Sequence, residues 1–205
     1  MKPPPKPESK GYRIENCRRC RNTANDTGPL QHRIETLLEQ ENLLSFLKQR
    51  VKGPIRIHHE LRVALAACPN GCSQPQIKDV GIIGAAIPGL TGQDCTLCEA
   101  CVKVCREQAV HLDNSHPIIE FNQCLYCGQC AAVCPSGTIA VEKKGFRVQL
   151  GGKLGRHPQL AKELPGLFSE DEVLHIIRKG LAFYKEHSQP EERFADLFRQ
   201  AIALF

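Results

Sequence analysis

The sequence predicts an α+β protein in which helices and short strands surround a cysteine-rich middle segment. Three observations predict this class: some segments have the apolar spacing of helices, shorter runs have the composition of strands, and cysteines recur in a fixed pattern between them. The chain has 205 residues, of which 12 are cysteine, and 41% of it is apolar. That is enough chain for one domain with a modest core, or for one domain plus a small insert.

Residues 1–12 are predicted to form a disordered tail, because they begin MKPPPKPESK, which is polar and rich in proline. We recognise no signal sequence, and no apolar run reaches the roughly 18 residues that a membrane span needs. We therefore expect a cytoplasmic protein without a membrane span. In such a compartment cysteines bind metals more often than they form disulfides.

Three segments have the amphipathic pattern of helices. The first covers residues 30–51, where apolar side chains recur every three to four positions. Ser169 and Glu172 form a capping box for a second helix that runs to about His187. A last amphipathic stretch follows Pro190 and completes the helical part of the predicted fold.

Short apolar runs between these helices have the composition of strands. The alternation of Ile55, Ile57 and His59 predicts one such strand. We expect the others at residues 80–86, 109–112, 139–142 and 146–150.

Eight of the twelve cysteines form two runs with the same spacing, C-x2-C-x2-C-x3-C. The second run repeats the first, 29 residues later at every position. A tight loop of this spacing brings three thiolates to one four-iron cluster. Zinc also takes four cysteines at C-x2-C spacing, but zinc sites do not usually come as duplicated three-plus-one runs. The runs are Cys95, Cys98, Cys101 and Cys105, then Cys124, Cys127, Cys130 and Cys134.

The segment from Gln93 to Glu142 resembles the bacterial ferredoxins that carry two [4Fe–4S] clusters. Pro135 follows the second run as in those proteins, whereas Arg106 takes the place of proline after the first. The resemblance implies that the fourth cysteine of each run binds the cluster of the other run. It thus implies a first cluster on Cys95, Cys98, Cys101 and Cys134, and a second on Cys124, Cys127, Cys130 and Cys105.

The four remaining cysteines, Cys17, Cys20, Cys68 and Cys72, are the number that a third cluster requires. On spacing alone, a C-x2-C pair and a distant C-x3-C pair fit either an iron–sulfur cluster or zinc.

The motif from Cys68 to Cys72, CPNGC, closely resembles the second half of the cluster motif in sirohaem-dependent sulfite and nitrite reductases. The stretch at residues 79–84 supports the likeness, and GGKLGRHP at residues 151–158 resembles the region after that motif. Dissimilatory and anaerobic sulfite reductases have a ferredoxin module inserted between two such pieces. The resemblance therefore implies a split reductase-like half-domain, residues 13–90 plus 143–205, with a two-cluster ferredoxin domain inserted at 91–142.

The same resemblance implies an oxidoreductase with a third [4Fe–4S] cluster, whose cysteine Cys72 bridges to a sirohaem iron. The inserted clusters would take electrons from a low-potential donor for the reduction of sulfite or nitrite. Lys153 and Arg156 are candidates for contacting sirohaem carboxylates or substrate oxyanions, because they lie in a glycine-rich stretch that lets a large ligand approach. The implied ligands of the third cluster are Cys17, Cys20, Cys68 and Cys72.

Two departures from that family shape the expected partners. The first cysteine pair of the family is usually C-x5-C, whereas this chain has Cys17-x2-Cys20. Complete enzymes also contain a second, related half that supplies much of the basic lining, so we expect a homodimer or a second reductase subunit. The alternative is a haem-free multi-cluster electron-transfer protein or subunit without a substrate site of its own.

Nucleic acid is not an expected partner. The formal charge of +5 falls to about −1 if three clusters each contribute about −2 through their thiolates. The chain also has few aromatic residues and no basic stripe interleaved with them.

Overall fold

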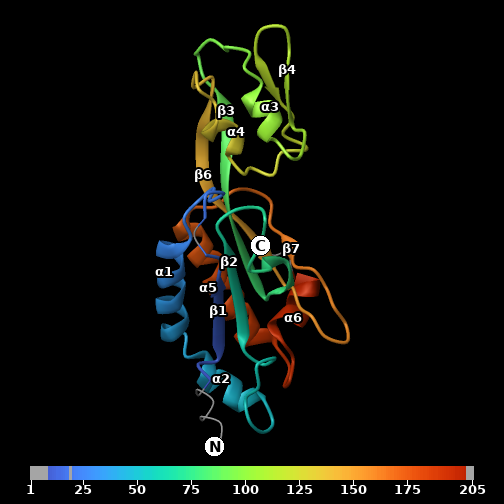
Figure 1. Ribbon diagram of the computed structural model, residues 1–205. Coiled ribbons are helices and arrows are strands. Elements are labelled where there is room, and N and C mark those ends of the chain that lie inside the picture. The colour runs from blue at the N-terminus through green and yellow to red at the C-terminus, as the bar shows by residue number, and fades with distance from the viewer. Residues whose placement is uncertain (1–8, 19, 202–205) are drawn as a thin grey trace, which may run out of the picture.

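The computed structural model describes residues 9–18 and 20–201. We call residues 91–142 the insert and the rest of the described chain the framework; the insert lies at one end of the framework (Figure 1). Most of the predicted tail, residues 1–8, lies outside the described residues. The last residue of that tail, Tyr12, is buried and begins the first strand. The described part of the chain has no helix with the length and apolar character that a membrane span requires.

A five-stranded mixed sheet in the order β1-β2-β3-β6-β7 forms the centre of the framework. Strand β2 pairs in parallel with both β1 and β3, whereas β6 is antiparallel to β3 and to β7. Helices and strands pack in one framework, which confirms the predicted α+β class. The strands are β1 (Tyr12–Asn16), β2 (Leu61–Ala66), β3 (Val80–Leu90), β6 (Ile139–Leu150) and β7 (Lys162–Glu163).

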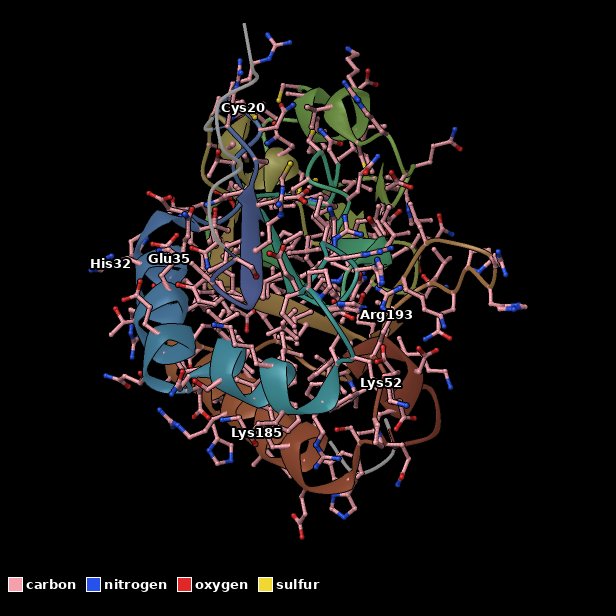
Figure 2. The ribbon with its side chains drawn as sticks, turned by 90° about the horizontal axis from the view of Figure 1, so that it is seen from below. Cys20, His32, Glu35, Lys52, Lys185 and Arg193 are labelled. Atoms are coloured by element: carbon pink, nitrogen blue, oxygen red, sulfur yellow. The ribbon has the colours of Figure 1, made fainter. Side chains whose placement is uncertain are left out.

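Helices pack against one face of this sheet. The framework core contains alternate residues of the strands, such as Tyr12 in β1 and Leu61, Val63 and Leu65 in β2, together with apolar residues of the helices. Figure 2 shows α1, α2 and α5 from below, with His32 of α1 pointing away from the core. The helices are α1 (Gly28–Gln40), α2 (Leu43–Arg50), α5 (Glu170–His187) and α6 (Phe194–Ala201).

The single helix predicted for residues 30–51 is wrong, because the chain forms α1 and α2 with a break between them. Asn42 has a left-handed backbone with a φ of 47°, a conformation that asparagine adopts more readily than most residues. By contrast, α5 begins at the predicted capping box: the Ser169 hydroxyl accepts from the Glu172 N–H, and the Glu172 side chain accepts from the Ser169 N–H.

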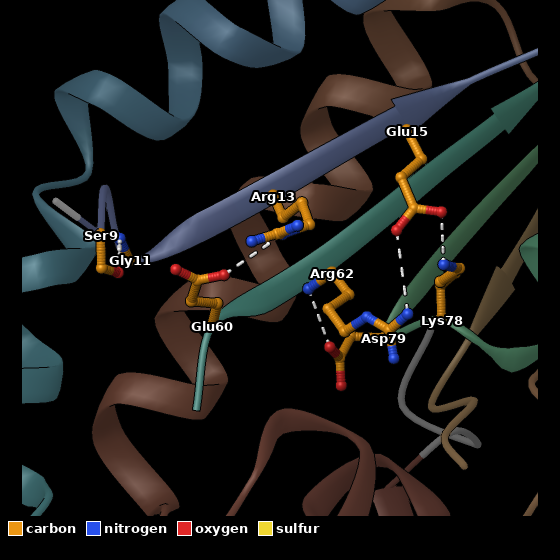
Figure 3. Close-up of polar contacts among 8 residues, drawn as sticks. All are labelled: Ser9, Gly11, Arg13, Glu15, Glu60, Arg62, Lys78 and Asp79. Carbon is orange, nitrogen blue, oxygen red and sulfur yellow. Dashed lines mark hydrogen bonds and ion pairs between the residues drawn. The ribbon is translucent and has the colours of Figure 1, made fainter. Parts of the chain in front are cut away.

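The other face of β1 and β2 carries charged side chains, which pair with one another (Figure 3). Glu15 accepts from Lys78 Nζ at 2.6 Å, and Arg13 lies 3.5 Å from Glu60. The backbone N–H of Arg62 donates to a carboxylate oxygen of Asp79 at 2.8 Å. Next to this face, the short 3-10 helix η1 (Pro75–Ile77) packs against β3.

Strands β3 and β6 form a long antiparallel pair that leads from the framework to the insert (Figure 1). The sequence predicts two strands at residues 139–142 and 146–150, but β6 is continuous because residues 143–145 pair with residues 85–87 of β3. The insert contains α3 (Ala100–Val104), α4 (Gln129–Ala132) and a two-stranded sheet of β4 (Val110–Leu112) and β5 (Pro117–Ile119).

The strand predicted at Ile55, Ile57 and His59 is wrong. Residues 51–60 form bends and turns, in which the Arg56 N–H donates to Nδ1 of His59 at 3.1 Å. Three alternating residues are too few to specify a strand where no neighbouring strand is available for pairing.

Candidate metal centres

The two cysteine runs fold as the same loop. Each run has three residues with left-handed backbones, and those of the second run lie 29 positions after those of the first. A short helix begins at the corresponding position of each, α3 at Ala100 and α4 at Gln129. The left-handed residues are Leu97, Glu99 and Gln108 in the first run, and Tyr126, Gly128 and Gly137 in the second.

Backbone N–H groups point at two sulfurs of each run. Such hydrogen bonds favour the thiolate form, which is the form that binds iron. The four bonds, with the donor residue first, are Leu97 to Cys95 and Tyr126 to Cys124 at 3.4 Å each, Ala109 to Cys105 at 3.3 Å, and Ile139 to Cys134 at 3.4 Å.

The pKa values of two buried thiols, Cys101 and Cys130, depend on the charges of the cysteines that lie near them. Burial raises the pKa of Cys101, and the negative charges of Cys134 and Cys95 raise it further. Burial likewise raises the pKa of Cys130 to about 12, with further contributions from the negative charges of three cysteines. Those three are Cys124, Cys127 and Cys105. Cys105, the fourth cysteine of the first run, thus lies near Cys130 of the second, and Cys134, the fourth of the second run, lies near Cys101 of the first.

The remaining four cysteines meet at one edge of the framework sheet. Cys17 follows β1 and Cys68 lies just after β2, and because these strands are parallel their carboxyl ends lie at the same edge. The Ala67 N–H donates to the Cys17 sulfur at 3.1 Å. Burial raises the pKa of Cys68, and the negative charges of Cys20, Cys17 and Cys72 raise it further. Cys68 is buried whereas Cys72 is exposed, so the two ends of the CPNGC loop differ in accessibility.

A cavity of about 540 Å³ lies between this loop and the insert. The second run is held there by a hydrogen bond from the Ala86 N–H to the Tyr126 carbonyl, at 2.7 Å. Gly128 lies so close to β3 that a β-carbon at this position would be 2.9 Å from the β-carbon of Ala86. The cysteines that line the cavity are Cys68 from the loop and Cys105, Cys124, Cys127 and Cys130 from the insert.

Lys153 and Arg156, the two residues predicted to contact sirohaem carboxylates or substrate oxyanions, do not line this cavity. Lys153 forms an ion pair with Asp196 of α6, and only 13% of its side chain is exposed. It therefore ties the glycine-rich stretch to the last helix. Arg156 is exposed on the same stretch.

The part of the site that sequence reasoning missed is the junction itself, formed by Ala86 and Gly128. One signal was present in the sequence: a 29-residue offset aligns Gly128 with Glu99, and a glycine in place of a large residue indicates a close approach of backbone. Among the residues that the structure describes, no three His, Cys, Asp or Glu side chains are grouped so that they could hold a single metal ion. A [4Fe–4S] cluster is a larger group and its four thiolates bind four different irons.

Residues 15–201 match the family model for the nitrite and sulphite reductase 4Fe-4S domain. Among curated proteins, the chain is 31% identical over 174 residues to a subunit of the anaerobic sulfite reductase of Salmonella typhimurium, covering 82% of this chain and 46% of that protein. It is 32% identical over 135 residues to the coenzyme F420-dependent sulfite reductase of Methanocaldococcus jannaschii, covering 66% of this chain and 22% of that protein.

A crystal structure of dissimilatory sulfite reductase I has a similar fold, with a TM-score of 0.62 at 17% identity, covering 91% of this chain and 49% of that chain. The chain thus spans less than half the length of each of these three proteins. The family match covers most of the chain, and the sequence-based resemblance to sulfite and nitrite reductases is confirmed. The chain belongs to the nitrite and sulphite reductase 4Fe-4S domain family.

Proposed function

We propose that this chain is the iron–sulfur part of a reductase for sulfite or nitrite, and that it carries electrons from a low-potential donor through two ferredoxin-type clusters to a third cluster coupled to sirohaem. The observation that carries this proposal is the cavity between the framework and the insert. Four of its lining cysteines are the set proposed for the second cluster, and a fifth belongs to the set proposed for the third.

The donor atoms fit [4Fe–4S] clusters. Each proposed set consists of four thiols. In each set one thiol is buried, which raises its pKa, and two or three of the other thiols lie near enough for their charges to raise it further. Backbone N–H groups donate to one sulfur in the third set and to two sulfurs in each cysteine run. When bound, such clusters supply one-electron transfer. The ligand sets are those implied by crossed ligation, with Cys17, Cys20, Cys68 and Cys72 for the third.

Within the third set, Cys72 is the candidate for bridging to a sirohaem iron. Its thiol is exposed, whereas Cys68 is buried against Ala24 and Ala86. Cys72 can therefore reach a group that lies outside this chain's core. The left-handed Gly71, with a φ of 60°, turns the backbone between the two cysteines.

The remaining parts of the substrate site belong to a partner in this proposal. The relatives named above are longer, and one of them is a subunit of an anaerobic sulfite reductase. We infer that a second reductase subunit or a second copy of this chain supplies the basic residues around an oxyanion. The alternative, a haem-free electron-transfer subunit, is favoured by the ion pair of Lys153 with Asp196, which engages one of the two cationic candidates.

The two proposals differ in what the anaerobically purified chain contains. Iron and acid-labile sulfide are counted, and sirohaem is extracted into acidified acetone. About 13 irons per chain with extractable sirohaem would support the reductase, and about 12 irons without sirohaem, from a host that makes it, would support the haem-free carrier. About eight irons would mean that Cys17, Cys20, Cys68 and Cys72 hold no cluster, which contradicts both proposals.

Two cysteine variants separate the sites in a haem-containing preparation. Cys72→Ser is expected to change the haem absorption band together with the third cluster. Cys127→Ser is expected to leave the haem band in place while the second cluster is lost. Equal loss of the haem band in both variants would contradict separate sites.

A further inference from the structure

Three charged side chains line the cavity between the framework and the insert: Arg21, Arg106 and Glu107. Arg21 comes from the loop after Cys20, and the other two directly follow Cys105. Within residues 9–18 and 20–201, neither arginine side chain forms an ion pair or a hydrogen bond with another side chain. Both arginines are exposed, and they share the cavity wall with Cys68 and with the four thiols of the second set.

A cation at this position acts on the reduction potential of a neighbouring cluster. Each electron that a [4Fe–4S] cluster accepts adds one negative charge to a group that is already anionic through its thiolates. A guanidinium keeps its charge at all accessible pH values. Because both arginines are exposed, salt and water screen part of this field, which therefore acts mainly on a cluster close to them. A nearby arginine therefore stabilises the reduced form, whereas a nearby carboxylate opposes it.

We propose that Arg21 and Arg106 raise the reduction potential of the second ferredoxin-type cluster more than that of the first, and that Glu107 opposes them. This inference rests on the proposed function. The first set, Cys95, Cys98, Cys101 and Cys134, contributes no cysteine to the cavity wall, whereas the second set contributes all four. The arginines therefore hold an arriving electron at the junction with the third site. They are positioning residues and contact no substrate.

The sequence offers a variant that removes the charge of Arg106 with little change in backbone. Arg106 occupies the position that Pro135 has in the second run, 29 residues later. The preceding residue, Cys105, has φ −76° and ψ 105°, in the extended region that a residue before proline prefers. Arg106→Pro is therefore compatible with the loop on the Cys105 side.

The test is a redox titration of the anaerobic, cluster-loaded full chain, followed by electron paramagnetic resonance. The variants are Arg106→Pro, Arg106→Gln, Arg21→Gln and Glu107→Gln. Lys103→Gln is the matched control, because it removes a positive charge from the same insert at an exposed residue outside the cavity wall. Cys98→Ala identifies the signal of the first cluster.

Each arginine variant is expected to lower the potential of the second cluster, with a change of about tenfold in its reduction equilibrium, or about 59 mV for one electron. Glu107→Gln is expected to raise it, and Lys103→Gln to change it less than either arginine variant does. Equal potentials in all variants, or shifts of the same sign for arginine and glutamate variants, would overturn this inference while leaving the proposed function intact. Absence of a second-cluster signal in the unaltered chain would instead overturn the proposed function.

Discussion

The framework and the insert are stabilised by different means. The framework core contains 22 buried apolar residues from the sheet and the helices. The insert core contains four buried residues, Cys101, Val110, Cys130 and Ile139, and two of these are proposed iron ligands. A segment of about 50 residues with so small a core needs ligands or cross-links to stay folded. From this comparison we infer that the framework folds by apolar burial, and we propose that the insert depends on the clusters proposed for it.

Removing iron from the chain gives the largest expected difference between the two regions. In small zinc domains, bound metal contributes on the order of 10 kcal/mol to folding, and we expect the insert to depend on its clusters in a similar way. Anaerobic treatment with a chelator and a reductant should make backbone amides of residues 91–142 exchange rapidly with deuterium. Amides of α5 should stay protected. Equal loss of protection in both regions would contradict the comparison.

A buried carboxylate gives the framework a pH dependence of its own. Burial raises the pKa of Asp79 from 3.8 to about 6, although the N–H of Arg62 and the charges of Arg193 and Arg62 oppose this. The folded state thus holds a proton that the unfolded chain releases at lower pH. The resulting stability is fully present below pH 3.8 and is lost as the pH rises through about 6, on the order of 3 kcal/mol in all.

Asp79→Asn should remove that dependence. The measurement is urea unfolding followed by circular dichroism of the helices, at several pH values between about 5 and 7.5, for the variant and the unaltered chain. The difference in unfolding free energy between them is expected to change across this range. A constant difference would mean that Asp79 titrates in the folded chain as it does in the unfolded one.

At the junction between the framework and the insert, there is no room for a β-carbon on Gly128. Gly128→Ala places that atom 2.9 Å from the Ala86 β-carbon on a backbone with a φ of 70°. We expect a loss of about 2 kcal/mol in unfolding free energy, from left-handed strain and crowding together. The control is Glu99→Gly at the equivalent position of the first run, which relieves a left-handed φ of 58° and should not destabilise. Equal effects of both variants would show that Gly128 does not position the insert.

The two ends of α5 give the smallest expected effect. Ser169→Ala removes the hydroxyl that accepts from Glu172 and should cost about 1 kcal/mol, measured by thermal unfolding. Ser188→Ala at the other end is the matched control, because the buried Ser188 hydroxyl has no hydrogen-bond partner in the described part of the chain. That variant should be neutral or slightly stabilising. A greater loss for Ser188→Ala would contradict this assignment of the caps.

Local signals predicted the elements that depend on local interactions. The Ser169 and Glu172 capping box specified the start of α5, and the 29-residue repeat implied two equal loops, which share their left-handed positions. Strand β1 was missed because it pairs with β2, which lies about 50 residues later in the chain. The junction at Ala86 and Gly128 depends on how two segments pack, and spacing within one segment carries no information on that.

The central claim is that the set proposed for the second cluster adjoins the site of Cys17, Cys20, Cys68 and Cys72, whereas the set proposed for the first does not. The second set is Cys124, Cys127, Cys130 and Cys105. The most direct measurement is electron paramagnetic resonance of the fully reduced, anaerobic chain, in which neighbouring reduced clusters broaden each other's signals. Broadening of the third cluster's signal should persist in Cys98→Ala and disappear in Cys127→Ala. Persistence in Cys127→Ala with loss in Cys98→Ala would contradict the claim.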